Sequence, residues 1–305
     1  MQDYLLTPEG RRLAYNRIPG RGPGVVFLGG LRSDMTGTKA LYLQDWAESE
    51  GRAFLRFDYS GHGQSSGTFE EGAIGDWFED ATHVIDRMTE GPQILVGSSM
   101  GGWIALLLAR SMPERVAGLV TIAAAPDFTE DDMWAGMSDA ERELLLARGY
   151  VEQPSDYDGP YRISRRFIED GRDRLILRSP LPLPFPVRLL HGTADETVPW
   201  ERGMRVLEHA KGGDIRLTLV KGADHRFSTP ECLALITASI GEVLGEEAAG
   251  LKMPPGNPLT LSQTGTVFGA APLPAEGETT LALRRGAAFG FASCGLLARS
   301  RKSST

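Results

Sequence analysis

The chain has 305 residues and a formal net charge of −8 at pH 7, with a pI near 5.3. This length suffices for one large domain with a buried sheet, and the acidic balance argues against a nucleic-acid partner. Two cysteines, Cys232 and Cys294, cannot make a disulfide framework. No run reaches the roughly 18 apolar residues of a transmembrane segment, and the start of the chain lacks the pattern of a signal peptide. We therefore expect a cytoplasmic protein.

Apolar β-type runs alternate with amphipathic helical patterns along the chain. Because parallel strands need crossover helices, this alternation predicts an α/β fold, a mainly parallel sheet with helices on both faces. The predicted strands are 25–28, 53–57, 93–96, 117–122, 187–190 and 215–220. The predicted helices are 38–50, 73–90, 100–111, 200–211 and 230–244.

The first predicted strand, 25–28, is followed directly by Gly29, Gly30 and Leu31. Glycines at the end of a strand let the backbone approach a bound molecule closely. The Leu31 N–H is therefore a candidate donor to a ligand, and a plain Gly-Gly turn is the alternative.

The third predicted strand runs into Gly-Ser-Ser-Met-Gly at 97–101, a Gly-x-Ser-x-Gly pattern, and a helical pattern follows at once. A strand, sharp turn and helix of this kind hold the central serine in a strained conformation, so that its Oγ projects above the sheet edge. The central residue is Ser99, not Ser98. The glycines are needed because a Cβ at either position would collide with the neighbouring strand and helix. A Gly/Ser-rich turn without a nucleophile is the alternative.

A serine that attacks an acyl carbonyl creates an oxyanion, which two hydrogen-bond donors must stabilise. The backbone N–H that follows the nucleophile is the usual first donor, and here it belongs to Met100. The second usually comes from the loop after an early strand, which makes Leu31 N–H the candidate. The sequence thus predicts an oxyanion hole between these two backbone groups.

The alternation breaks between Pro126 and Pro186, where folds of this pattern carry a cap. A capping box at Ser138 predicts the start of a cap helix that ends at Gly149, and a second helix is predicted near 163–170. The Pro-rich run 180–186 predicts an extended return to the core. Methionine and aromatic side chains in the cap suit variable apolar chains, and Trp134 and Met137 are the candidates for a substrate pocket. Simple packing of the cap on the core is the alternative.

A serine nucleophile needs a base, and the base needs an orienting carboxylate, in the chain order Ser, then Asp or Glu, then His. Asp195 follows the strand at 187–190, in a loop at the carboxyl end of the sheet. Asp58 follows a strand too early in the chain, and Asp224 adjoins the expected histidine, so its side chain should point away. The prediction for the acid is Asp195, with these two as rivals.

His225 is the predicted base, because it follows the last predicted strand and has the right chain order. His62 lies upstream of the serine, and we expect it to support loop structure near the site. His191 ends a strand, where a structural hydrogen bond is expected. His83 and His209 lie in charged helical patterns typical of solvated faces.

Residues 248–305 differ in composition from residues 1–247, which we predict to be the folded domain with its cap insertion. They are rich in Gly, Pro, Ala, Ser and Thr, and carry six Lys and Arg against two acids. Such a segment has too little apolar periodicity to form a core, so we predict a low-complexity, disordered tail.

Several of these segments together resemble the α/β-hydrolase superfamily. Within it, residues 24–240 are similar to the branch of the mitochondrial palmitoyl-protein thioesterase, which is also an acyl-glucuronide esterase, and its bacterial relatives. The resemblance implies that Ser99, Asp195 and His225 are the nucleophile, the orienting acid and the base. The chain departs from this branch in lacking a mitochondrial presequence and in adding the tail. The matching segments are 36–40, 56–61, 91–103, 188–200 and 224–226.

These observations predict a serine hydrolase that cleaves acyl thioesters or carboxylic esters through an acyl-enzyme intermediate, with no cofactor and no metal. The expected partner is a small acyl ester or thioester, or an S-acylated protein. A general short-chain carboxylesterase is the alternative within enzymes. A non-catalytic ligand-binding protein on the same fold is the alternative from another class, because fold does not fix function.

Overall fold

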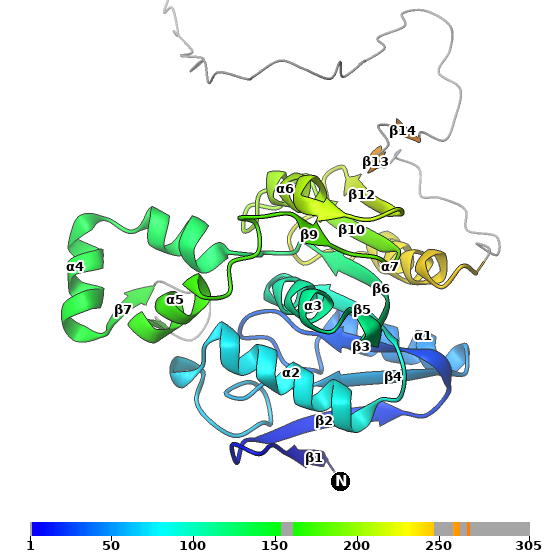
Figure 1. Cartoon of the computed structure of the whole chain (residues 1–305), viewed down its shortest axis with the longest axis horizontal. Coiled ribbons are helices and arrows are strands. Elements are labelled where there is room, and N and C mark those ends of the chain that lie inside the picture. Colours follow the sequence, from blue (N-terminus) through cyan, green and yellow to red (C-terminus); the bar gives the residue numbers. More distant parts are fainter. Residues whose placement is uncertain (1, 154–160, 247–258, 263–266, 269–305) are drawn as a thin grey trace, which may run out of the picture. The chain divides into compact units, whose positions relative to one another are not determined.

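The computed structural model describes residues 2–153, 161–246, 259–262 and 267–268. Ten strands within these ranges form one sheet (Figure 1). Across the sheet, the order is β1 (Asp3–Leu6), β2 (Arg12–Ile18), β4 (Arg52–Phe57), β3 (Arg21–Leu28), β5 (Gln93–Ser98), β6 (Val116–Ile122), β10 (Val187–Gly192), β12 (Ile215–Val220), β13 (Leu259–Ser262) and β14 (Val267–Phe268).

The centre of this sheet, from β4 to β12, is parallel throughout. The strands at both edges are antiparallel to their neighbours. The carboxyl ends of the parallel strands therefore meet at one edge of the sheet, which is where open α/β sheets build their sites. The expectation of a mainly parallel sheet is confirmed for the described residues.

Helices cover both faces of the sheet, each with its own apolar cluster. α1 (Thr38–Ser49) and α7 (Pro230–Val243) bury their apolar residues in one cluster. α2 (Ile74–Met88), α3 (Met100–Ser111) and α6 (Glu201–His209) bury theirs in the other, on the opposite face (Figure 1). Within β5, Ile94 and Val96 belong to the first cluster and Leu95 to the second. Burial on both faces explains why the central strands are continuously apolar.

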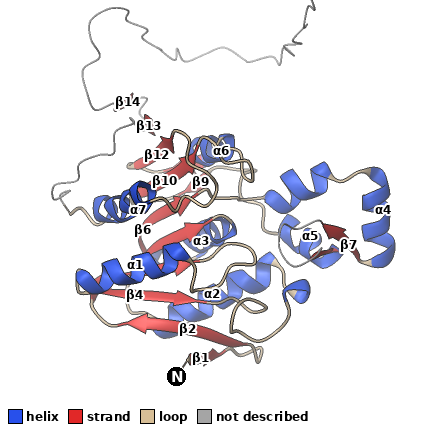
Figure 2. Cartoon of the chain, turned by 180° about the vertical axis from the view of Figure 1, so that it is seen from behind, coloured by secondary structure: helices blue, strands red, loops and turns tan. Residues whose placement is uncertain are grey.

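The cap lies between β6 and β10 in the sequence, and its helices gather to one side of the sheet (Figure 2). The predicted helix is α4 (Asp139–Arg148), with Ser138 accepting a hydrogen bond from Glu141 N (3.3 Å) and Gly149 at φ 80° after its end. The other elements are the π-helix η3 (Thr129–Trp134), β7 (Tyr150–Gln153), β8 (Tyr161–Ser164), α5 (Arg165–Arg172) and β9 (Leu181–Pro182), which pairs with β11 (Ala210–Lys211). Two 3₁₀ turns, η1 (Phe69–Glu71) and η2 (Pro113–Arg115), lie outside the cap.

The sequence analysis did not foresee the strands at the two edges of the sheet. β1 and β2 are short or partly exposed, so their residues show no continuous apolar run. β13 and β14 fall within the segment expected to be a tail, yet β13 pairs with β12 along residues 216–219. The rest of residues 248–305 lies outside the described residues, and the domain boundary at 247 stays a prediction.

Candidate active site

Ser99 occupies the turn between β5 and α3, with φ 55° and ψ −118°. The glycines around it are required by close packing. A Cβ on Gly97 would lie 2.3 Å from the carbonyl oxygen of Gly101, and a Cβ on Gly101 would lie 2.1 Å from that of Leu28. Both distances are far inside van der Waals contact. The strand, turn and helix that the Gly-x-Ser-x-Gly pattern predicts are therefore present.

The Ser99 side chain lies in a hydrogen-bonded series with the two other residues expected at the site. His225 Nε2 lies 3.1 Å from Ser99 Oγ, and His225 Nδ1 lies 2.8 Å from Asp195 Oδ2. The Asp195 side chain is fully buried, whereas that of His225 is 26% exposed. Asp195 and His225 follow β10 and β12, so the parallel sheet brings three distant segments to one edge. This arrangement can transfer the serine proton to an oriented imidazole.

Asp195 is held by more donors than His225 alone. Its Oδ1 accepts hydrogen bonds from Thr197 N (3.0 Å) and Val198 N (2.8 Å). Burial by itself would raise the pKa of Asp195, but the hydrogen bonds from His191, His225 and Val198 N outweigh it and hold the pKa well below the usual range. The carboxylate is therefore ionised at neutral pH, as an orienting acid must be.

His191 approaches the same carboxylate from inside the protein. Its Nε2 lies 2.9 Å from the carbonyl oxygen of Val198 and 3.4 Å from Asp195 Oδ2. Because a carbonyl oxygen can only accept, this nitrogen carries the proton. The structural hydrogen bond expected of His191 is confirmed, but its contact with the candidate acid was not foreseen.

The rival carboxylates make other contacts. Asp58 accepts hydrogen bonds from Met35 N (2.6 Å) and Gln64 N (2.8 Å). Asp224 accepts one from Phe227 N (3.1 Å). Both therefore stabilise loops, and the contact between Asp195 and His225 supports the choice made from the chain order.

The two candidate oxyanion donors flank Ser99. Met100 is the first residue of α3, and the first N–H groups of a helix have no intrahelical acceptor. On the other side, a Cβ on Gly30 would lie 3.4 Å from Ser99 Cβ, so the backbone just before Leu31 passes directly beside the serine. Backbone N–H groups at these two positions suit a developing negative charge on an acyl oxygen.

His62 supports the loop that carries Leu31. His62 Nε2 accepts a hydrogen bond from Arg32 N (3.1 Å), and Nδ1 faces the carbonyl oxygen of Ser60 at 3.2 Å. Arg32 has φ 57°, a conformation that non-glycine residues seldom adopt. Burial lowers the pKa of His62, so the ring stays neutral and Nε2 remains an acceptor. The expected role of His62 in loop structure thus gains a specific partner, which no sequence pattern indicated.

The two candidates for the substrate pocket lie in different surroundings. Met137 is buried in the apolar cluster, whereas Trp134 is only partly buried. Trp134 lines a cavity of about 620 Å³ at the cap, and the guanidinium groups of Arg142 and Arg172 lie 5.2 Å and 4.4 Å from its ring centre. This cavity is lined by neither Ser99, Asp195 nor His225. An acyl pocket at these two side chains stays a prediction.

The described residues also bear on membrane-spanning and metal-binding functions. In that part of the chain, no helix combines the length and apolar character needed to span a membrane. The same residues contain no group of three or more His, Cys, Asp or Glu side chains placed to hold a metal ion.

Comparisons with known proteins show which family and which solved structures the chain resembles. The model of the alpha/beta hydrolase family matches residues 25–232. The mitochondrial palmitoyl-protein thioesterase ABHD10 of Rattus norvegicus is 39% identical over 243 residues, which cover 79% of this chain and 82% of that protein. The solved structure of mouse alpha/beta hydrolase domain-containing protein 10 has a TM-score of 0.75 and 37% identity, covering 80% of this chain and 98% of that one. A structure from Agrobacterium vitis S4 has a TM-score of 0.76 and 39% identity, with the same coverage.

Proposed function

Because this chain belongs to the alpha/beta hydrolase family and is a hydrolase enzyme, we propose that it cleaves acyl thioesters or carboxylic esters at Ser99 through an acyl-enzyme intermediate. The observation that carries the proposal is the series of hydrogen bonds from Ser99 Oγ to His225 and on to Asp195. A serine hydroxyl is a weak nucleophile, and such a series is how hydrolases activate it.

In the proposed reaction, Ser99 Oγ attacks the acyl carbon while its proton moves to His225 Nε2. The carbonyl oxygen becomes an oxyanion, which the N–H groups of Met100 and Leu31 stabilise. The tetrahedral intermediate then collapses: the bond to the thiolate or alkoxide breaks, and His225 returns the proton to the leaving group. In the second half, His225 takes a proton from water as the water attacks the acyl-serine; the bond to Ser99 Oγ then breaks, His225 returns the proton to Oγ, and the carboxylic acid leaves.

The buried Asp195 carboxylate stabilises the imidazolium that forms in each half-reaction. It does not take up the proton, because its pKa lies well below the usual range. It also fixes the tautomer of His225 that presents a basic Nε2 to the serine. Losing one oxyanion donor in such sites costs on the order of 10²–10³ in kcat, so the Met100 and Leu31 N–H groups would supply a similar share of the rate.

The relatives are named palmitoyl-protein thioesterases, which suggests the first substrate class to test, a long-chain acyl thioester, including an S-acylated protein. A short-chain carboxylesterase is the second candidate, because the same chemistry serves oxygen esters. The relatives are named as mitochondrial, while the sequence analysis favours a cytoplasmic protein. The compartment and the acyl group therefore remain proposals.

The experiment is a hydrolysis panel of p-nitrophenyl esters and acyl thioesters with chains from C2 to C16, with the Ser99→Ala variant as the blank. The proposal expects turnover of both bond types, and long-chain thioesters among the substrates. Turnover of short oxygen esters alone would favour the carboxylesterase. If no substrate is turned over faster than by the Ser99→Ala blank, the proposed activity is wrong and the non-catalytic alternative gains support.

A further inference from the structure

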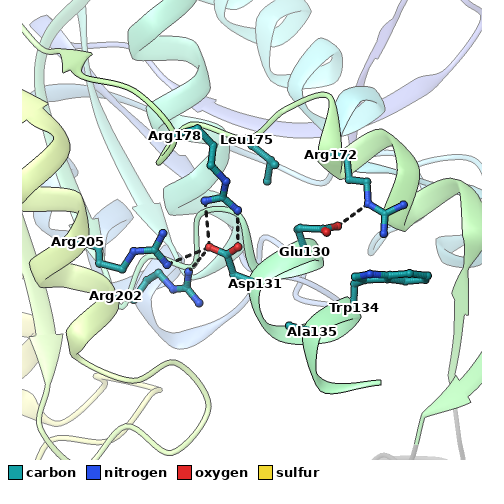
Figure 3. Close-up of a pocket in the computed structure, with 9 residues that line it drawn as sticks. All are labelled: Glu130, Asp131, Trp134, Ala135, Arg172, Leu175, Arg178, Arg202 and Arg205. Carbon is teal, nitrogen blue, oxygen red and sulfur yellow. Dashed lines mark hydrogen bonds and ion pairs between the residues drawn. The ribbon is translucent and has the colours of Figure 1, made fainter. Parts of the chain in front are cut away.

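A basic cavity lies where the cap meets α6, and the proposed reaction does not use it. It measures about 620 Å³, and four arginines line it together with Glu130, Asp131 and the apolar side chains of Trp134, Ala135 and Leu175 (Figure 3). The arginines come from two separate parts of the chain. Two of them belong to the cap and two to α6, and the four are Arg172, Arg178, Arg202 and Arg205.

The lining of this cavity carries more positive than negative charge. Three guanidinium groups share the single carboxylate of Asp131: Arg178 binds both of its oxygens, and Arg202 and Arg205 each lie 3.0 Å from Oδ2 (Figure 3). Arg172 pairs with Glu130. Four cations therefore face two anions in a chain whose net charge is −8.

Further carboxylates offset part of this charge from outside the lining. Asp132 accepts a hydrogen bond from Arg202, and the buried Asp127 accepts one from Arg178 at 3.1 Å. Among the described residues, Arg205 pairs with no second carboxylate of this kind, and its side chain is 40% exposed. Arg172 is similarly exposed, at 36%. These two side chains can therefore turn N–H groups toward a bound anion.

Asp131 itself remains ionised, so the arginines are already aligned. Burial tends to raise the pKa of Asp131, but the hydrogen bonds from Arg178 and Arg205 outweigh it and lower the pKa. The shared carboxylate holds the guanidinium groups in place before any ligand arrives. Preorganised donors of this kind bind an anion without first paying for their own ordering.

The cavity is connected to the candidate active site through short stretches of chain. Ala125 N donates a hydrogen bond to Ser99 O at 3.1 Å, and Asp131 follows six residues later. Six residues span at most about 20 Å even when fully extended. Arg202 likewise follows Asp195 by seven residues. The Cα atoms of Ala125 and Asp131 are therefore within about 20 Å of each other, a separation that an elongated ligand can span.

From this arrangement we infer that the cavity binds a phosphate or diphosphate group. Arginine forks match phosphate oxygens in geometry, and a phosphate monoester carries about −1.5 to −2 charges at pH 7, so it can pair with the partly exposed guanidinium groups of Arg172 and Arg205. The group is carried either by the leaving group of a phosphopantetheine-type thioester or by a free phosphorylated ligand. The first source rests on the proposed function, and the second does not.

The test compares two thioesters with the same acyl chain, an acyl-CoA and the phosphate-free acyl-N-acetylcysteamine. The variants are Arg205→Glu and the milder Arg205→Gln, with melting temperature as the check on folding. The matched control is Arg21→Glu, because Arg21 is 56% exposed and lies 3.7 Å from its nearest carboxylate, at the start of β3. Pyrophosphate binding by calorimetry provides a readout that needs no catalysis.

If the phosphate belongs to the leaving group, Arg205→Glu raises the ratio of the two KM values, acyl-CoA over acyl-N-acetylcysteamine, by about tenfold. Arg205→Gln raises it less, and Arg21→Glu leaves it unchanged. If the phosphate belongs to a free ligand, the ratio stays constant but Arg205→Glu weakens pyrophosphate binding by a similar factor.

An unaltered ratio, together with pyrophosphate binding that is absent or insensitive to Arg205, overturns the inference and leaves the cluster as a link between cap and core. Should the wild-type protein hydrolyse neither thioester, the proposed function fails. The calorimetric arm still decides whether the cavity binds phosphate, so the two failures are distinguishable.

Discussion

The backbone at Ser99 is what exposes its hydroxyl group. A non-glycine residue at φ 55° and ψ −118° costs on the order of 1–3 kcal/mol. Two hydrogen bonds help to offset this cost, from Ser99 N to Ile122 O (2.9 Å) and from Ala125 N to Ser99 O (3.1 Å). They join the turn to the end of β6 on the neighbouring segment. The strained turn therefore depends on the parallel pairing of β5 and β6.

The identity of the candidate nucleophile, acid and base could be predicted because their order and local patterns are strong signals. The supporting contacts could not. His191 reaches Asp195 only because the loop after β10 folds back to place Val198 beside it. His62 finds Arg32 only because the backbone there turns to φ 57°. Both contacts depend on backbone geometry that short residue patterns do not encode.

The two histidines near Ser99 should respond differently to pH. His225 must be neutral to accept the serine proton, so kcat/KM should rise with pH over the range in which histidine loses its proton. His225→Gln should abolish this rise along with most of the rate, whereas His62→Gln should keep it. The measurement is the pH profile of kcat/KM for each variant. A retained rise in His225→Gln would assign the base to another residue.

Burial lowers the pKa of His62, so the unfolded chain binds its proton more readily than the folded one. The stability that neutral His62 contributes is therefore complete above the ordinary histidine range and is lost as the pH falls below it. If His62 Nε2 were protonated, two hydrogen-bond donors, Nε2–H and Arg32 N–H, would face each other and their hydrogen bond would be lost. Acid should thus loosen this loop, and melting temperatures measured against pH for the wild type and for His62→Gln test whether the loss of stability depends on His62.

At the scale of elements, the strands with both faces buried were predictable and those at the edges were not. β5 and β6 are almost fully buried and apolar along their length. The hairpin of β7 and β8 has only four residues in each strand, and one residue of each strand is buried, so its pattern is weak. α4 was predictable because the capping box and the C-terminal glycine mark both of its ends. Local signals therefore define helices well and short exposed strands poorly.

The cap should supply the pocket for the acyl chain. Each buried CH₂ contributes about 0.8 kcal/mol, so four more carbons could raise kcat/KM by roughly 10²-fold while room remains. We expect activity to rise from C2 to about C6–C8, and Trp134→Gln or Met137→Gln to flatten that slope in the ester panel. Leu146→Gln is the matched control, since Leu146 is 51% exposed on α4.

A flat or falling profile in the unmodified enzyme would rule out an apolar acyl pocket. A slope that survives both substitutions would place the pocket elsewhere. Because Met137 is buried, its variant needs a melting temperature beside the kinetics. The arginines around Trp134 make Met137 the stronger test of the two.

For the whole molecule, the sequence alone predicts that a chain ending at Glu247 keeps its stability and its kcat/KM. The structure changes the expectation for stability, because β13 pairs with β12 and covers its edge. Removing β13 would leave the backbone N–H and C=O groups at that edge of β12 unpaired and exposed to solvent. We therefore expect a chain ending at Glu247 to melt a few degrees lower, with kcat/KM retained because the Ser99 site lies upstream.

A chain ending at Ala270 is the control, since residues 1–270 form one compact unit. It should melt like the full chain in scanning calorimetry. Equal melting temperatures for all three chains would show that β13 adds nothing to stability, and would support the boundary predicted at 247. A fall in kcat/KM on truncation would link the later residues to the site.

The central claim is that Ser99 is the nucleophile, and covalent labelling with a fluorophosphonate tests it most directly. The account predicts one adduct per chain, which peptide mass spectrometry locates at Ser99. Ser99→Ala should abolish labelling and lower kcat by about 10⁴–10⁶-fold, while the adjacent Ser98→Ala should keep both labelling and most of the activity. An adduct on Ser98, or full activity in Ser99→Ala, would contradict the account.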